Sequence, residues 1–274
     1  MSPILVIAGK EVADGLRNRW IVGATLVLAM LACALALLGS APTGSLGVKP
    51  LAVTVVSLAS LTIFLVPLIA LLLSYDTIVG EIERGTMLLL LTYPITRTDL
   101  LLGKVLGHCC ILAIATVVGY GGAGLAVGLG QGSDPQSWAA FGLLLVTSVM
   151  LGGAFVALAT LISLAVRERG TAAGLAVALW LVFVVVFDLV LLGLLVAGQG
   201  VVDPKLFSWL LLANPADVFR LANLTGFDNV RLFSGMAGLA ADMRISSGTL
   251  LAALAAWMIV PLAAALILFR RREL

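Results

Sequence analysis

Charged residues are scarce in this sequence, and their scarcity excludes an ordinary soluble protein. Only 11% of the 274 residues are charged and 62% are hydrophobic, whereas soluble domains contain about 25% charged residues. A soluble chain of this length could bury a large core, but it would still need a polar surface. The formal net charge of +2 is too small to indicate a nucleic-acid partner, and we expect none.

Residues that carry out chemistry are equally few. The one histidine is His108, and the three cysteines are Cys33, Cys109 and Cys110. Adjacent side chains point to different faces of a helix, so we expect no metal at His108-Cys109-Cys110. Neither an HExxH nor a GxSxG motif occurs, and Asp188 has no second acidic residue in its apolar run. We therefore predict a chain that is not an enzyme and that binds no cofactor itself.

Long apolar runs are what the sequence has in abundance. A membrane-crossing helix needs about 20 apolar residues, and six stretches qualify. They predict an all-α polytopic membrane protein, with residues 1–274 forming a single transmembrane domain surrounded by lipid. The six predicted spans are residues 21–38, 51–74, 105–129, 141–166, 171–195 and 249–269.

Two features lie within these spans. The pairs Gly124-x-x-x-Gly128 and Gly170-x-x-x-Gly174 allow close helix approach. Asp188 is the one acidic residue deep in a span, where a carboxylate is costly unless it is paired or protonated. It is either a polar relay or substrate contact, or else a hydrogen-bonded packing contact.

Basic residues in the flanks indicate the orientation, because lysine and arginine favour the cytoplasmic side. The opposite side has fewer, and four of its five lie in one connection of residues 197–248, where the rule weakens. Both termini are therefore predicted to be cytoplasmic. The cytoplasmic set is Lys10, Arg17, Arg19, Arg84, Arg97, Lys104, Arg167, Arg169, Arg270, Arg271 and Arg272, and the opposite set is Lys49, Lys205, Arg220, Arg231 and Arg244.

Residues 1–20, before the first span, have one apolar and one polar helical face. This pattern predicts an amphipathic helix lying in the membrane interface. The alternative is a cytoplasmic extension of the first span. The apolar face comprises Ile4, Leu5, Ala8, Val12, Leu16 and Trp20, and the polar face comprises Lys10, Asp14, Arg17 and Asn18.

The connection at residues 75–104 is the most informative stretch. Pro94 stops a helix, Thr96 can cap the next one, and Asp99 stands in a capping-box position. Beside the charged residues 76–84 lies an apolar run at residues 87–91. A plain solvated connector would explain the charges but not this run. We therefore predict a short helix that projects from the membrane towards an intracellular partner.

The run GEIERGTMLLLLTYPITRTDLLLGK in this connection resembles the signature of type-2 ABC exporter permeases. The six spans and the amphipathic leader are similar to that family too. The resemblance implies a coupling helix seated in a separate cytoplasmic ATPase dimer. Because Gly103-Lys104 lacks the rest of a phosphate-binding loop, ATP and Mg would be bound by that partner. The coupling residues implied are Gly80, Glu81, Arg84, Gly85 and Thr86.

Longer strings resemble one branch of this family, whose transporters act in the maturation of nitrous oxide reductase, a copper enzyme of denitrifying bacteria. The resemblance implies a homodimer in the bacterial inner membrane, together with a periplasmic copper-delivering protein of β-helical type that carries the copper. The strings are KEVADGLRNRW, LLLSYDTIVGE, FDLVLLGLLV and WLLLANPADVFRLANLTGF.

The periplasmic connection, residues 197–248, twice pairs a capping residue with proline, at Asp203-Pro204 and Asn214-Pro215. It therefore predicts short helices at 204–213 and 215–224, too short to span and too apolar to be free loops. They form either a helical cap over the bundle or a docking site for the periplasmic partner. In the second case Asn214, Asp217 and Arg220 would orient the contact.

The leading hypothesis is thus a permease subunit that transmits ATPase motion to the periplasmic side. The alternative is an exporter of a small molecule or lipid from the same family. The fold would not distinguish the two, but a continuous polar lining between protomers would favour the exporter.

Overall fold

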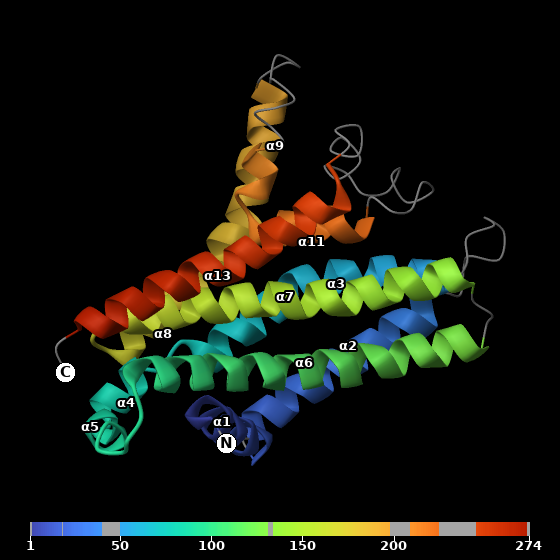
Figure 1. Cartoon of the computed structure of the whole chain (residues 1–274). Coiled ribbons are helices and arrows are strands. Elements are labelled where there is room, and N and C mark those ends of the chain that lie inside the picture. The colour runs from blue at the N-terminus through green and yellow to red at the C-terminus, as the bar shows by residue number, and fades with distance from the viewer. Residues whose placement is uncertain are drawn as a thin grey trace.

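The computed structural model describes residues 2–17, 19–39, 50–130, 134–197, 209–224 and 245–272. Within these ranges every regular element is a helix, and the long helices lie side by side in an elongated bundle (Figure 1). Half of the predicted helix at 204–213, residues 204–208, falls outside the described residues, and residues 209–212 are helical. In chain order the main elements are α1 (Pro3–Arg17), α2 (Arg19–Gly39), α3 (Pro50–Ser74), α4 (Val79–Glu83), α5 (Thr86–Leu90), α6 (Arg97–Gly130), α7 (Pro135–Ala165), α8 (Arg169–Leu181), η2 (Val182–Val186), α9 (Phe187–Ala197), α11 (Pro215–Leu224) and α13 (Ser247–Arg271).

The described chain is an all-α polytopic membrane protein, as predicted. Five stretches are long and apolar enough to cross a bilayer: Leu51–Glu83, Arg97–Gly130, Pro135–Ala165, Arg169–Leu194 and Ser247–Arg271. A sixth is counted if α1 and α2 are taken as one broken span, since the two helices meet at 72°. Predicted span 21–38 corresponds to α2, and the predicted amphipathic leader corresponds to α1.

Side-chain caps determine where two of the long helices begin. The Thr96 hydroxyl accepts from the N–H of Asp99 at 3.1 Å, and the Asp99 carboxylate accepts from the N–H of Thr96 at 3.1 Å. This reciprocal capping box is the one predicted, and it starts α6 well before the apolar span. Asp134 caps α7 by accepting from the N–H of Ser137 at 3.3 Å, with Pro135 in the first turn.

Glycines in α6 allow α1 to pack directly on it. A Cβ atom at Gly103 would lie 2.6 Å from Cβ of Ile7, and one at Gly107 would lie 2.5 Å from Cβ of Glu11. Larger residues at these positions would therefore push the helices apart. The same device works further along α6, where Gly124 and Gly128 face Phe141 and Trp138 of α7. The close approach predicted for Gly124 and Gly128 is thus confirmed.

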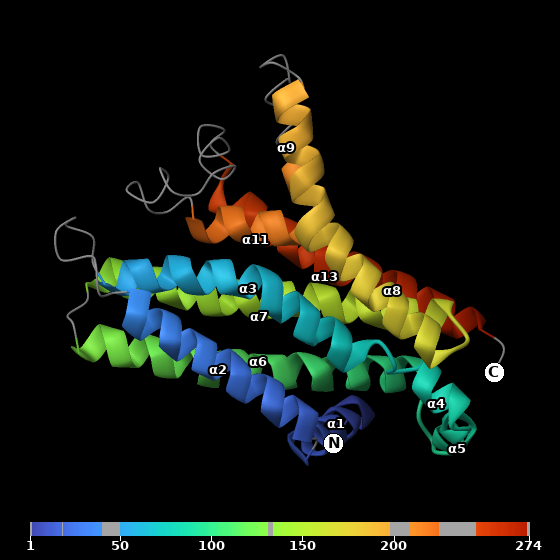
Figure 2. The same ribbon diagram turned by 180° about the vertical axis from the view of Figure 1, so that it is seen from behind.

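The fifth predicted span is not a continuous α-helix. The π-helical segment η2 lies between α8 and α9 and adds a residue to the local turn. From η2 onward the chain diverges from the bundle, so that α9 stands apart from α3 and α7 (Figure 2). Only 17% of the most apolar window of Arg169–Leu194 is buried, against 61% for Pro135–Ala165. The fifth span therefore offers most of its surface to the surroundings.

Candidate functional site

The connection between α3 and α6 forms two short helices, α4 and α5, at one end of the bundle (Figure 1). We call residues 79–90 the α4–α5 hairpin. The prediction of one coupling helix around residues 80–86 is wrong, because this stretch is divided between two short helices. Gly85 has a φ of +72°, a left-handed conformation that an α-helix cannot contain and that favours glycine. The helix is therefore broken at Gly85, and the chain turns there between α4 and α5.

Backbone and apolar contacts fix the base of the hairpin to the long helices. The Ser163 hydroxyl of α7 accepts hydrogen bonds from the N–H groups of Ile78 and Val79, each at 3.0 Å. The N–H of Arg169, at the start of α8, donates to the Glu83 carboxylate at 2.6 Å. A separate buried cluster joins the hairpin to α6, α7 and α13: Ile78, Met87, Leu100, Leu101, Leu164, Ala265 and Phe269.

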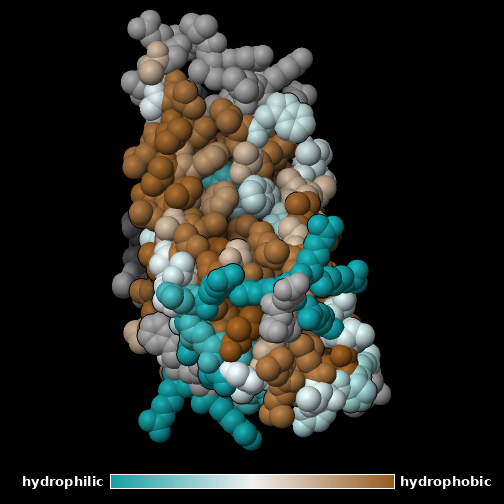
Figure 3. All heavy atoms as spheres, turned by 90° about the vertical axis from the view of Figure 1, so that its left-hand side faces the viewer, coloured by the Kyte–Doolittle hydropathy of each residue, from teal (hydrophilic) through white to brown (hydrophobic). Residues whose placement is uncertain are grey.

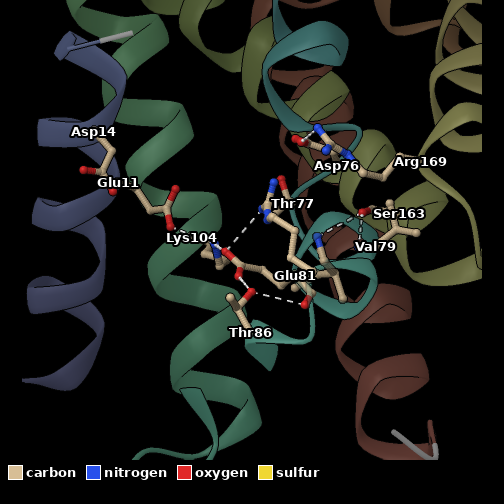
Figure 4. Close-up of polar contacts among 12 residues, drawn as sticks. Glu11, Asp14, Asp76, Thr77, Val79, Glu81, Thr86, Lys104, Ser163 and Arg169 are labelled. Carbon is tan, nitrogen blue, oxygen red and sulfur yellow. Dashed lines mark hydrogen bonds and ion pairs between the residues drawn. The ribbon is translucent and has the colours of Figure 1, made fainter. Parts of the chain in front are cut away.

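A buried lysine links the hairpin to α1 (Figure 4). Nζ of Lys104 lies 3.1 Å from Oε1 of Glu81 and 2.8 Å from Oε1 of Glu11, and the lysine side chain is 5% exposed. The Thr86 hydroxyl donates to the Glu81 carboxylate, and His108 Nε2 lies 3.7 Å from Glu11. Buried charges of this kind need partners, because an unpaired one is strongly destabilising. The three segments are thus tied together at one point.

The predicted coupling residues share this cluster but play different parts in it. Glu81 faces inward, whereas the half-exposed Arg84 lies 3.8 Å from it at the surface. Gly80 is buried, and a Cβ there would lie 3.3 Å from the Arg84 guanidinium and from the Asp76 carboxylate. Asp76 in turn accepts from Arg169 at 2.8 Å. The signature residues therefore shape and anchor the hairpin from within.

The outward surface of the hairpin is apolar. Leu88 is 64% exposed, Leu89 is 63% exposed and the following Tyr93 is 62% exposed. Figure 3 looks onto this end of the molecule and shows hydrophilic side chains gathered around apolar surface. None of these three residues was among the predicted site residues. The signal that could have identified them was the apolar run at 87–91 beside the charges.

A second polar network lies where α11 meets the start of α9. Arg220 donates to Asp188 at 2.7 and 3.2 Å and to Asp217 at 2.7 Å. Asn214 donates to Asp217 at 2.9 Å and to the carbonyl of Phe183, in η2, at 2.8 Å. Of the two alternatives given for Asp188, the described chain shows the hydrogen-bonded packing contact. The sequence argument counted only acidic residues within the apolar run, so it named Asp217 as a partner contact and did not place it beside Asp188.

The predicted partner-contact residues all belong to this internal network. Asn214 and Asp217 are fully buried, and Arg220 is mostly buried. Burial raises the pKa of Asp217 to about 7, assisted by the Asp188 charge and opposed by the Arg220 guanidinium. These side chains hold α11 against the fifth span, and a role in orienting a partner would act through α11 itself.

The His108-Cys109-Cys110 cluster is part of the packing of α6. Nδ1 of His108 lies 3.4 Å from the Thr77 hydroxyl, and both cysteines are free and partly buried. In the part of the chain that the structure describes, no group of three or more His, Cys, Asp or Glu residues is placed to hold a metal ion.

Comparison of the sequence with known proteins finds one matching family and two similar relatives. Residues 5–274 match the family described as ABC-2 family transporter protein. The chain is 48% identical over 275 residues to the probable ABC transporter permease protein NosY of Stutzerimonas stutzeri, and the match covers 99% of each chain. It is 49% identical over 277 residues to the protein of the same name from Pseudomonas aeruginosa, with 100% of each chain covered.

Proposed function

Because the chain belongs to the ABC-2 transporter family and is a permease subunit of an ABC transporter, we propose that the α4–α5 hairpin couples it to a cytoplasmic ATPase dimer. ATP and Mg would be bound by that ATPase, and this chain would transmit force. Both termini would then lie in the cytoplasm of a bacterium, with the chain in its inner membrane.

The observation that carries this proposal is that the base of the hairpin is fixed to the long helices, whereas its tip is exposed and apolar. Its base is fixed to α1, α6, α7, α8 and α13 by Lys104, Ser163, Arg169 and the apolar cluster. Its tip exposes Leu88 and Leu89, which lie outside every candidate membrane span. An exposed apolar surface on a rigid base marks a protein contact, and movement of the tip would be transmitted to several spans.

A homodimer is proposed from the surface of the fifth span. A Cβ atom added at Gly170 or at Gly174 of α8 would have nothing within 4 Å, so this predicted close-approach pair is open within one chain. Leu189 and Val190 of α9 are 62% and 54% exposed. A second copy packed on this side would cover small residues and apolar side chains alike.

The finer function we propose is maturation of the copper site of nitrous oxide reductase. Similarity along the whole chain to the two permeases supports it, as do the strings that resemble this branch. The copper would be carried by a periplasmic β-helical protein. The described residue best placed to touch such a partner is Trp209, which is 72% exposed just before α11.

One experiment tests these assignments together. The tagged chain is purified in detergent from a denitrifying bacterium, the co-purifying proteins are identified by mass spectrometry, and the mass of the complex gives the copy number. We expect two permeases, two ATPases and a β-helical periplasmic protein. The double variant Leu88→Asp with Leu89→Asp should lose the ATPase and leave nitrous oxide reductase without copper.

The matched control is Leu129→Asp, an exposed leucine at the opposite end of α6. It should retain the ATPase and normal copper content. Normal ATPase recovery and normal copper content in the double variant would refute the coupling proposal, and purification without any β-helical protein would refute the maturation proposal.

A further inference from the structure

A cavity of about 560 Å³ opens between α1, α6 and the end of α3. It is within the range of about 300–1,000 Å³ typical of ligand sites. Its polar wall is formed by Glu11, Asp14, Asp76, His108 and Arg169. Because Asp76 follows directly on the apolar α3 and α1 is amphipathic, the cavity lies where a membrane's headgroups meet its hydrocarbon.

The charges around the cavity are nearly balanced. Glu11 is paired with Lys104 at 2.8 Å, Asp14 with Lys10 at 3.2 Å and Asp76 with Arg169 at 2.8 Å. Lys104 is shared with Glu81, which Arg84 approaches to 3.8 Å. With that pair included, four carboxylates face four cations. A strongly charged cation or anion would upset this balance, whereas a zwitterion preserves it. Each carboxylate still has free lone pairs that can accept from an ammonium group.

One side-chain N–H donor of Arg169 has no acceptor in the described part of the chain. Nε of Arg169 is buried and has no hydrogen-bond partner among the described residues, although the guanidinium end reaches Asp76. Nε itself is closed off, but the Arg169 side chain is 39% exposed and lines the cavity, so the rest of its guanidinium can donate to a ligand there. A phosphate oxygen is the acceptor that an arginine fork fits best.

A small apolar cleft borders the cavity. Leu73 and Ile111 line both, and beyond them the cleft runs between α2, α3 and α6 past Leu28 and Val66. The cleft holds only about 20 Å³ of open space, too little for an acyl tail, so the tail of an amphiphile would lie in the surrounding lipid while its head occupies the polar chamber.

We propose that this cavity binds the headgroup of a phospholipid that carries a primary ammonium group, as in phosphatidylethanolamine. The phosphate accepts from Arg169, and the ammonium donates to the carboxylates of Glu11, Asp14 and Asp76. A choline headgroup has no N–H donors and needs aromatic faces, of which this cavity offers only Tyr75 among the described residues. The inference does not depend on the proposed function.

Native mass spectrometry of the full-length chain in detergent tests the proposal, with phosphatidylethanolamine, phosphatidylcholine and phosphatidylglycerol titrated separately. We expect phosphatidylethanolamine to bind about ten-fold more tightly than the other two, as the loss of a charge-assisted hydrogen bond implies. Arg169→Gln and Asp14→Asn should each weaken its binding, and Ile111→Trp should block it.

Ile114→Trp is the matched control, because Ile114 lies on the same helix, is 42% exposed and does not line the cavity. It should bind phosphatidylethanolamine like the wild type. Equal affinity for the three lipids, or a preference for phosphatidylglycerol, overturns the proposal. Unchanged binding in both Asp14→Asn and Ile111→Trp overturns it as well, and Asp14→Asn guards against misfolding because Asp14 is exposed.

Discussion

At the scale of single residues, Lys104 connects the parts that must move together. Sequence reasoning found Glu81, through the resemblance of its surrounding motif, and placed Lys104 in the Gly-Lys pair of the same motif. It could not place Glu11 beside them. Glu11 is 93 residues from Lys104 along the chain, and the contact exists only because Gly103 and Gly107 let α1 pack against α6.

Replacing Lys104 with methionine should destabilise the permease. The change leaves the carboxylates of Glu11 and Glu81 buried without their shared cation, and breaking a buried pair costs about 3–5 kcal/mol. The melting temperature of the purified protein in detergent should fall clearly. Lys10→Met is the control, because the exposed Lys10–Asp14 pair contributes only about 0–1 kcal/mol. Equal melting temperatures for the two variants would show that the cluster is not structural.

The raised pKa of Asp217 predicts a pH dependence of stability. Its pKa is about 7 in the folded chain against 3.8 as the ordinary value. Between these values the folded state holds a proton that the unfolded state releases, so this residue's contribution to stability falls as pH rises from about 4 to 7. Asp217→Asn, compared with the wild type by melting temperature across this window, should remove that decline. A difference between the two proteins that does not vary with pH would contradict the assignment.

At the scale of elements, the hairpin shows both the reach and the limit of sequence reasoning. The capping box at Thr96 and Asp99 was predictable because it is local, and so was a break after Pro94. The division into α4 and α5 was not predicted, because glycine is tolerated in a helix and nothing nearby required a left-handed conformation at Gly85. The π-helical segment in the fifth span was missed for a similar reason, since valine-rich residues 182–186 read equally well as α-helix.

Gly85→Ala should loosen the hairpin, because a side chain in the left-handed region costs about 1–2 kcal/mol. Amide hydrogen exchange across residues 79–90 should become faster than in the wild type. Gly9→Ala serves as the control: Gly9 lies inside α1 with open space around it, so alanine should be neutral there or slightly stabilising. Unchanged exchange in Gly85→Ala would show that the turn at residue 85 does not depend on glycine.

At the scale of the whole molecule, the bilayer made the fold class predictable. Apolar runs of membrane-spanning length leave the chain little choice but helices, because backbone groups in lipid must be satisfied internally. How the helices pack was less accessible. The Asp188–Arg220–Asp217 network joins two elements that a long connection separates, and periodicity carries no information about such contacts. The exposed fifth span is likewise a property of the folded chain.

The central claim is that the tip of the α4–α5 hairpin contacts a cytoplasmic ATPase. The most direct measurement is site-specific cross-linking in membranes from Leu88→Cys, with Cys33, Cys109 and Cys110 replaced by alanine and with Leu129→Cys as the control. The account predicts a cross-link from position 88 to an ABC ATPase and none from position 129. Labelling of position 88 by a membrane-impermeant reagent added outside the cell, without any cross-link to an ATPase, would contradict it.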